Sequence, residues 1–256
     1  MKTFCFTVDD NIRFLRELTE HPRDSLFDHP YPAMYRRFHE KYGLKVQLNL
    51  FYRDESFDLS QMTDRYRDEW AHNADWLKLS FHSDYENVKP YEFSSYDEVY
   101  RDCRAVHREI VRFASPAALA ETTTIHYCLT TPEGLDALRD NGIRGLLGLY
   151  GDEQHPRTSY GCDEEEATRI REGEMIARDG VVYAPIDMVI NGFDTQRAIA
   201  TLAPMTVRQR LWIMIHEQYF YPDYQWYQPE FEQKLDAVFS LLTDKGYVSH
   251  FYEELL

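Results

Sequence analysis

The chain has 256 residues, of which 43% are hydrophobic, and it carries a formal net charge of −16 at neutral pH. A chain of this size can bury a substantial core as one large α/β domain. The acidic balance argues against a nucleic-acid partner and against an anionic membrane surface, and no apolar stretch approaches the roughly 20 residues that a bilayer span needs.

Strand-like and helix-like stretches alternate along the chain. The first strand begins directly at the N-terminus, so we expect no signal peptide. Asp10 or Asn11 is placed to cap the helix that follows it. Apolar alternation predicts strands at residues 4–8, 44–51, 76–81, 122–125, 143–149, 181–186, 211–215 and 247–251. Helical spacing between capping residues predicts helices at residues 12–18, 32–42, 62–73, 96–113, 132–141 and 230–244.

These elements make seven or eight β/α units, with connections long enough for right-handed crossovers. We therefore expect parallel strands, closed into a barrel, in a single domain over residues 1–256. A polar stretch at residues 152–179 breaks the rhythm and contains three consecutive glutamates. We interpret it as an insertion in the same domain, and its charge run as a solvated surface.

Four cysteines lie far apart and form neither a CxxC pair nor a disulfide-framework spacing. We expect reduced, mostly buried thiols in a cytoplasmic protein. The residues are Cys5, Cys103, Cys128 and Cys162.

Acids and histidines recur at the downstream ends of the predicted strands. If the strands are parallel, these groups gather at one rim, where folds of this kind carry their chemistry. This arrangement favours a metal-assisted hydrolytic site. The groups are the pair Asp9-Asp10, His82 with Glu86 four residues later, His126-Tyr127 and His216-Glu217.

Each group also has a plainer explanation. The aspartate pair can simply cap the next helix. Glu86 can be a solvated loop residue, in which case His126 is the alternative third ligand beside Asp10 and His82. A lone histidine such as His216 can be a hydrogen-bonded structural residue.

Four short motifs occur in one order, and together they resemble the polysaccharide deacetylases of carbohydrate esterase family four. Residues 7–11 read TVDDN, similar to that family's TFDDG, and residues 82–86 read HSDYE, similar to its HSxxxH or HTxxxH. Residues 125–127 read IHY where the family has RxPY, and residues 213–216 form a strand that ends in histidine. The departures at Asn11, Glu86 and His126 indicate a divergent branch.

The resemblance implies a distorted (β/α) barrel of about seven parallel strands and one divalent metal ion, usually zinc. It implies that Asp10 and His82 bind the metal, with Glu86 in place of the second histidine. It also implies that Asp9 is the general base and His216 the general acid. A second carboxylate would favour a harder ion such as manganese or magnesium.

The resemblance further implies removal of acyl groups from an N- or O-acetylated sugar or a small amide. His126, Tyr127 and Tyr219 are the candidate substrate-binding residues, and Tyr219 belongs to an aromatic tract that can stack on sugars or pack in a core. Two alternatives stay open. One is a catalytically silent carbohydrate-binding relative, and the other is a two-carboxylate glycoside hydrolase that uses Asp9 with Glu86 or Glu217.

Overall fold

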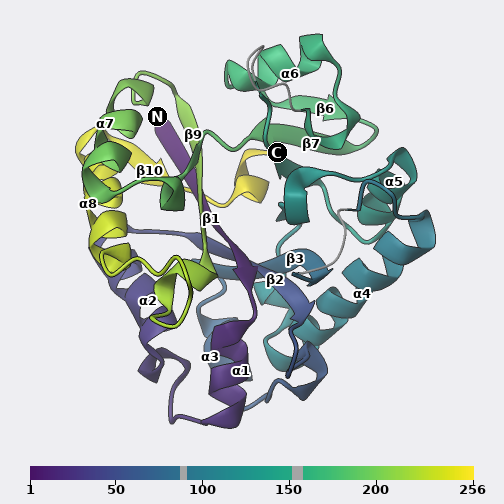
Figure 1. Cartoon of the computed structure of the whole chain (residues 1–256), viewed down its shortest axis with the longest axis vertical. Coiled ribbons are helices and arrows are strands. Elements are labelled where there is room, and N and C mark those ends of the chain that lie inside the picture. The colour runs from purple at the N-terminus through teal and green to yellow at the C-terminus, as the bar shows by residue number, and fades with distance from the viewer. Residues whose placement is uncertain (87–90, 152–157) are drawn as a thin grey trace.

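The computed structural model describes residues 1–86, 91–151 and 158–256, and its strands form two sheets (Figure 1). The larger sheet has the order β3-β2-β1-β9-β8, with β10 beside β1, and the smaller has the order β4-β5-β7-β6. The larger sheet contains β1 (Lys2–Asn11), β2 (Val46–Arg53), β3 (Leu77–Tyr85), β8 (Met188–Val189), β9 (Arg210–His216) and β10 (Tyr247–Ser249). The smaller contains β4 (Thr122–Thr123), β5 (Gly145–Gly148), β6 (Ile176–Arg178) and β7 (Val181–Pro185).

The helices cover the outside of these sheets, as Figure 1 shows. They are α1 (Arg13–Glu20), α2 (Pro30–Tyr42), α3 (Arg67–His72), α4 (Tyr96–Phe113), α5 (Pro132–Asp140), α6 (Glu164–Arg171), α7 (Thr195–Met205) and α8 (Phe231–Asp244). Phe239 of α8 packs on Phe4 and Phe6 of β1, with ring centroids 6.1 and 5.0 Å apart. Strand β1, which is buried along almost its whole length, is therefore the centre of the core.

The two sheets follow one another around a distorted barrel. Every paired strand is parallel to its neighbour except β6, which pairs antiparallel with β7. At one seam, the Ala120 amide donates to the Leu79 carbonyl of β3 at 2.9 Å. At the other, the Asp187 amide, just after β7, donates to the Trp212 carbonyl of β9 at 2.8 Å. The expected α/β class with parallel strands is confirmed, although no continuous ladder among residues 1–86, 91–151 and 158–256 closes the barrel.

Most predicted elements are present, and some differ in length. Helix α4 spans the predicted residues 96–113, where Ser95 and Glu98 form a capping box. The helix predicted at residues 62–73 is reduced to the six residues of α3. Helix α7 was not predicted, and it carries Pro204 in its last turn. Neither Asp10 nor Asn11 caps α1, whose N-cap residue is Ile12, so that prediction was wrong.

The predicted insertion lies partly outside the described residues, which resume at residue 158. Its described part contains α6 and β6. Asp163 and Glu166 form a capping box on α6, and the glutamates occupy its first turn, where they complement the helix dipole. That residues 152–179 are an insertion in a single domain stays a prediction.

The four cysteines are free and buried, as expected for reduced thiols. In the part of the chain that the structure describes, no helix combines the length and apolar character needed to cross a bilayer.

Candidate metal centre

Three side chains from different parts of the barrel converge on one point. Asp10 lies near the end of β1, His82 lies within β3, and His126 follows β4. His82 Nε2 is 3.0 Å from Asp10 Oδ1, and His126 Nδ1 is 3.4 Å from the same oxygen. The two ring nitrogens are 3.1 Å apart. Asp10 and His82 are buried and His126 is partly buried, and one ligand atom of each lies within 4.8 Å of the others.

Backbone carbonyls fix the orientation of both imidazoles. His82 Nδ1 bonds to the Thr124 carbonyl, and His126 Nε2 bonds to the Glu86 carbonyl at 3.1 Å. A carbonyl only accepts, so each of these nitrogens carries the proton, and in the neutral rings His82 Nε2 and His126 Nδ1 present lone pairs. Asp10 Oδ1, which they face, is buried and has no hydrogen-bond donor of its own.

A divalent cation between these three acceptors, or a proton on one of the rings, removes the repulsion between them in the buried site. The site offers two imidazole nitrogens and one carboxylate oxygen. This donor set suits zinc and other first-row divalent ions. The residues present therefore fit the divalent metal that the sequence resemblance implies.

The backbone at Asp10 explains how two adjacent aspartates serve one site. Neighbouring residues of a regular strand point to opposite faces. The pairing of β1 with β2 shifts register between Val8 and Asn11, and Asp10 has a left-handed φ of 64°. The strand therefore does not end at the pair, as the sequence suggested, but bulges there. Such strain in a non-glycine residue is typical of functional sites.

The protonation of these groups is strongly coupled. Burial opposes ionisation of Asp10, but His126 and His82 outweigh it and hold the pKa of this carboxyl well below its usual value. Burial also lowers the pKa of His82, but Asp9 and Asp10 outweigh it and raise the pKa above its usual value. The pKa of Asp9 is raised, because burial outweighs the nearby histidines. The site favours a charged Asp10 beside a more basic Asp9.

A buried polar chain holds Asp9. Asn49 Nδ2 donates to Asp9 Oδ1 at 2.7 Å, and Gln47 Nε2 donates to Asn49 Oδ1 at 2.8 Å. Gln47 also bonds to Thr122 of β4, so this hydrogen-bond network links the two sheets below the site. Asp9, held in this way through Oδ1, lines the cavity over the metal group.

His216 lies at the end of β9 and faces the site through Nε2. Its Nδ1 donates to Asn191 Oδ1 at 2.8 Å, and its Nε2 is 3.9 Å from Asp10 Oδ2. The structure therefore brings His216 to the same site as Asp9. Sequence reasoning missed Asn191, because it lies 25 residues away in a short turn with no motif of its own.

Glu86 is beside the metal group and not within it. Its backbone carbonyl orients His126, and its Oε1 accepts from Gln218 Nε2 at 3.2 Å. Gln218 Nε2 also donates to Asp10 Oδ2 at 2.8 Å, so Gln218 joins the two carboxylates. Of the two alternatives for a third donor, the structure places His126 against Asp10 and His82. Sequence reasoning did not identify Gln218.

Glu217 points away from His216 and caps α1. Its carboxylate accepts the backbone N–H groups of Ile12, Arg13 and Phe14 at 2.8–3.0 Å. Tyr221 donates its hydroxyl to the same carboxylate at 2.9 Å. Burial raises the pKa of Glu217 to about 7, although these four donors favour the charged form. Both oxygens of the Glu217 carboxylate therefore serve a structural role, as acceptors for these groups.

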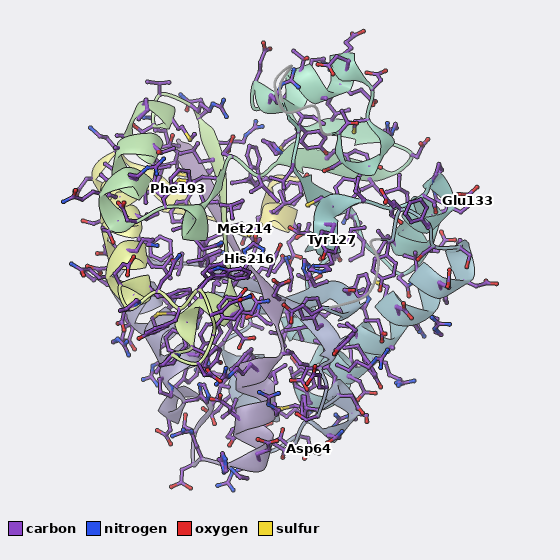
Figure 2. All side chains as sticks on the ribbon, viewed as in Figure 1. Asp64, Tyr127, Glu133, Phe193, Met214 and His216 are labelled. Carbon is purple, nitrogen blue, oxygen red and sulfur yellow. The ribbon has the colours of Figure 1, made fainter. Side chains whose placement is uncertain are left out.

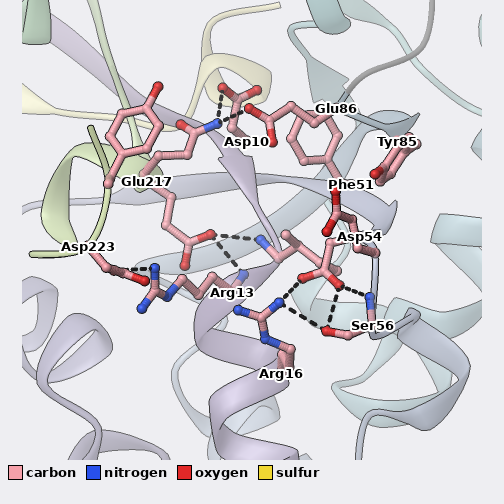
Figure 3. Close-up of a pocket in the computed structure, with 14 residues that line it drawn as sticks. Asp10, Arg13, Arg16, Phe51, Asp54, Ser56, Tyr85, Glu86, Glu217 and Asp223 are labelled. Atoms are coloured by element: carbon pink, nitrogen blue, oxygen red, sulfur yellow. Dashed lines mark hydrogen bonds and ion pairs between the residues drawn. The ribbon is translucent and has the colours of Figure 1, made fainter. Parts of the chain in front are cut away.

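Two cavities meet at this site. One, of about 350 Å³, is lined by Asp9, the three residues of the metal group, His216, Tyr127 and Tyr219. Figure 2 shows His216 and Tyr127 near the middle of the molecule. The other, of about 400 Å³, begins at Asp10 and Glu86 and extends past Asp54 and the two arginines of α1 (Figure 3).

The candidate substrate-binding residues all lie around the first cavity. The ring of His126 is 4.1 Å from that of Tyr127, which is 47% exposed and has a left-handed φ of 61°. Tyr219 lies on the other side, with its ring centroid 6.2 Å from that of His216. His126 thus belongs to the metal group, while the tyrosines flank the cavity.

Comparison with known proteins gives a likeness in structure but none in sequence. No protein-family model matches the chain, and a search of curated proteins finds no match. A family 4 acetyl xylan esterase from Clostridium thermocellum, solved with a cobalt ion, is similar over 99% of this chain and 90% of its own, with a TM-score of 0.54 and 14% identity.

Two further solved structures are similar. One is a carbohydrate esterase family 4 pseudoenzyme from Bacillus anthracis, with a TM-score of 0.54 and 11% identity over 99% of this chain and 65% of its own. The other is a 4-alpha-glucanotransferase from Thermococcus litoralis, with a TM-score of 0.59 and 14% identity over 98% of this chain and 38% of its own. At these identities the likeness shows the fold alone. It confirms the fold that the sequence motifs suggested, and the chemistry must be argued from the site.

Proposed function

We propose that this chain is a metal-dependent hydrolase that removes an acyl group, such as acetyl, from an N- or O-acetylated sugar or a small amide. The observation that carries the proposal is the convergence of three potential metal ligands, Asp10, His82 and His126, beside Asp9 and His216. The buried cysteines and the absence of a disulfide among them support a cytoplasmic location.

Asp10, His82 and His126 would hold the metal ion. When bound, such an ion polarises the acyl carbonyl and lowers the pKa of water, which makes the water a nucleophile near neutral pH. With His126 as the third donor, the set carries one negative charge, which favours zinc over the harder ions that a second carboxylate would select. Manganese and magnesium remain the alternatives to compare.

Asp9 and His216 would move the protons. Asp9 has a raised pKa, and Asn49 holds its carboxylate at the cavity, so it can accept a proton from the attacking water. Asn191 accepts the Nδ1 proton of His216, and this leaves Nε2 facing the cavity. In the imidazolium form, Nε2–H is the proton available to the departing amine or alcohol.

Two contacts argue against the two-carboxylate alternative. That chemistry needs a second carboxyl group free to act on the sugar. Both oxygens of Glu217 are used by backbone amides and Tyr221, and Glu86 is held by Gln218. The remaining alternative is a carbohydrate-binding protein without catalysis.

The test measures acetate release from small acetylated sugars before and after treatment with a chelator. We expect release that stops with chelator, returns with zinc, and is lost in Asp10→Ala and His82→Ala. Activity that persists in chelator would support the two-carboxylate mechanism. Sugar binding without acetate release at any metal concentration would support the silent relative.

A further inference from the structure

A buried lysine is connected by hydrogen bonds to the segment that orients the candidate acid His216. The side chain of Lys234, near the start of α8, has no exposed surface. Its Nζ donates to the Phe193 carbonyl and to Gln228 Oε1, both at 2.5 Å. One carboxylate, of Glu230, lies 3.7 Å from Nζ and is partly exposed. Two neutral oxygens therefore lie closer to the ammonium group than this carboxylate does.

These contacts continue to His216 through Gln228 and Asn191. Gln228 Nε2 donates to the Asn191 carbonyl at 2.8 Å, and Asn191 Oδ1 accepts from His216 Nδ1 at 2.8 Å. Asn191 lies in the single helical turn Ile190–Gly192, which ends directly before Phe193. The glutamine and the lysine therefore bind two backbone carbonyls at this turn, one of Asn191 itself and one two residues later.

The turn lies where the sheet no longer holds the chain. Strand β8 has two residues, and its last pair joins Val189 to Met214 of β9. Asn191 and His216 each lie two residues further on, past the end of this ladder. The hydrogen bonds from the glutamine and the lysine therefore fix the turn in place of ladder bonds.

The burial of Lys234 is explained better by these donors than by fold stability. Taking an ammonium group out of water is energetically costly, and an apolar side chain of similar volume would avoid that cost. Burial lowers the pKa of Lys234 accordingly, although Glu230 and Asp194 favour the charged form. What a lysine adds is a set of N–H donors for buried oxygens.

We propose that Lys234 is a positioning residue for His216. Its ammonium group fixes the turn that carries Asn191, and Asn191 in turn fixes the imidazole of His216. This inference rests on the proposed function, in which His216 gives a proton to the leaving group. A general acid must be placed accurately, since a displacement of about 1 Å can lower a rate about 100-fold.

The direct test follows the imidazole of His216 by ¹⁵N NMR of the full chain, at a pH where the ring is neutral, with His216→Ala to assign the signal. We expect the wild type to carry the proton on Nδ1. Lys234→Met should give a mixture of the two neutral tautomers and faster exchange of the Nδ1 proton, by about tenfold or more. Lys245→Met, the same substitution at an exposed position after α8, is the matched control. An unchanged tautomer and exchange rate in Lys234→Met would overturn the proposal.

Turnover separates positioning from a general loss of stability. We expect Lys234→Met to lower kcat for acetate release about tenfold, by no more than Asn191→Ala does, and to leave KM within about twofold. In an Asn191→Ala background, the same substitution should lower kcat by less than about twofold, because the residue through which Lys234 acts is already absent. Equal losses of kcat in the two backgrounds would refute this pathway.

A second variant keeps the test decisive if Lys234→Met does not fold. Gln228→Ala, at a partly exposed loop position, removes the bond to the Asn191 carbonyl and should change the tautomer of His216 in the same direction. A tautomer that responds to these variants, in a protein that releases no acetate, would keep the positioning network and remove the proposed function. Acetate release with a tautomer that responds to neither variant would do the reverse.

Discussion

His82 Nε2 and Asp10 Oδ1 lie 3.0 Å apart, while the other ring nitrogen of His82 bonds to the Thr124 carbonyl. In the neutral ring the backbone contact uses the only proton, so the short contact joins two acceptors, whereas in the imidazolium form Nε2–H donates to the carboxylate. His126 adds a third acceptor, oriented in the same way by the Glu86 carbonyl. In the proposed function a metal ion takes the place of that proton, and the predictions about the site depend on this exchange.

The identity of the third ligand is tested by comparing His126→Gln with Glu86→Gln. We expect His126→Gln to weaken zinc binding by more than about 100-fold, because loss of a second-shell partner alone typically costs 10- to 100-fold. Glu86→Gln should change it less than about tenfold, because the backbone carbonyl that orients His126 remains. Competition with a zinc-binding dye measures both affinities. A larger loss of zinc affinity in Glu86→Gln than in His126→Gln would identify Glu86 as the third ligand.

The role of His216 is tested by separating turnover from metal content. His216→Ala should lower kcat by about 10²- to 10⁴-fold, the usual contribution of a positioned general acid. Asn191→Ala should lower kcat by less, since the imidazole of His216 remains but loses the acceptor that orients it. Both variants should retain the metal, because His216 Nε2 is 3.9 Å from Asp10 and outside the metal group. Loss of metal from His216→Ala would show that His216 is a ligand.

The structural role of Glu217 predicts a loss of stability. In Glu217→Gln, the carboxamide NH₂ would face backbone N–H groups of α1, and we expect the free energy of unfolding to fall by about 2–4 kcal/mol. Urea denaturation measures the change, with Glu232→Gln, at an exposed ion pair, as the control. Unchanged stability together with lost activity would return Glu217 to the list of catalytic candidates.

The buried His107 on α4 should make the stability of the fold depend on pH. It is 7% exposed, and burial lowers its pKa from 6.5 to about 4. The unfolded chain therefore binds this proton more readily. The stability that the native state gains from holding His107 neutral is fully present above pH 6.5. It is lost as the pH falls toward 4, and the free energy of unfolding decreases by about 3 kcal/mol in all.

The variant His107→Gln should show a shallower fall in unfolding free energy over this pH range, measured by urea denaturation at several pH values. His72→Gln, at an exposed position, should keep the slope of the wild type. Parallel slopes for wild type and His107→Gln would contradict the assignment.

Local signals in the sequence were sufficient for the framework and for part of the site. The boundaries of α4 follow from its capping box and its apolar face. The gathering of Asp9, Asp10, His82, His126 and His216 follows from strand ends in a parallel sheet. These inferences succeed because each depends on short-range pattern and on one topological rule.

The remaining features depend on contacts between distant parts of the chain. Glu217 caps α1 from more than 200 residues away, so the aspartates that precede the helix were the nearer but wrong candidates. The bulge that turns Asp10 toward the site has no local signature, because the left-handed position is occupied by Asp10 itself and not by a glycine. Asn191 and Gln218 are ordinary amides until the fold places them against His216 and Asp10.

Elemental analysis of the untreated protein tests the central claim most directly. We predict about one tightly bound divalent ion per chain, lost in Asp10→Ala, and a higher melting temperature with the ion than without it, since a specific ligand stabilises the fold that binds it. A protein that contains no metal, and whose melting temperature is unchanged by zinc, manganese or magnesium, would contradict the account.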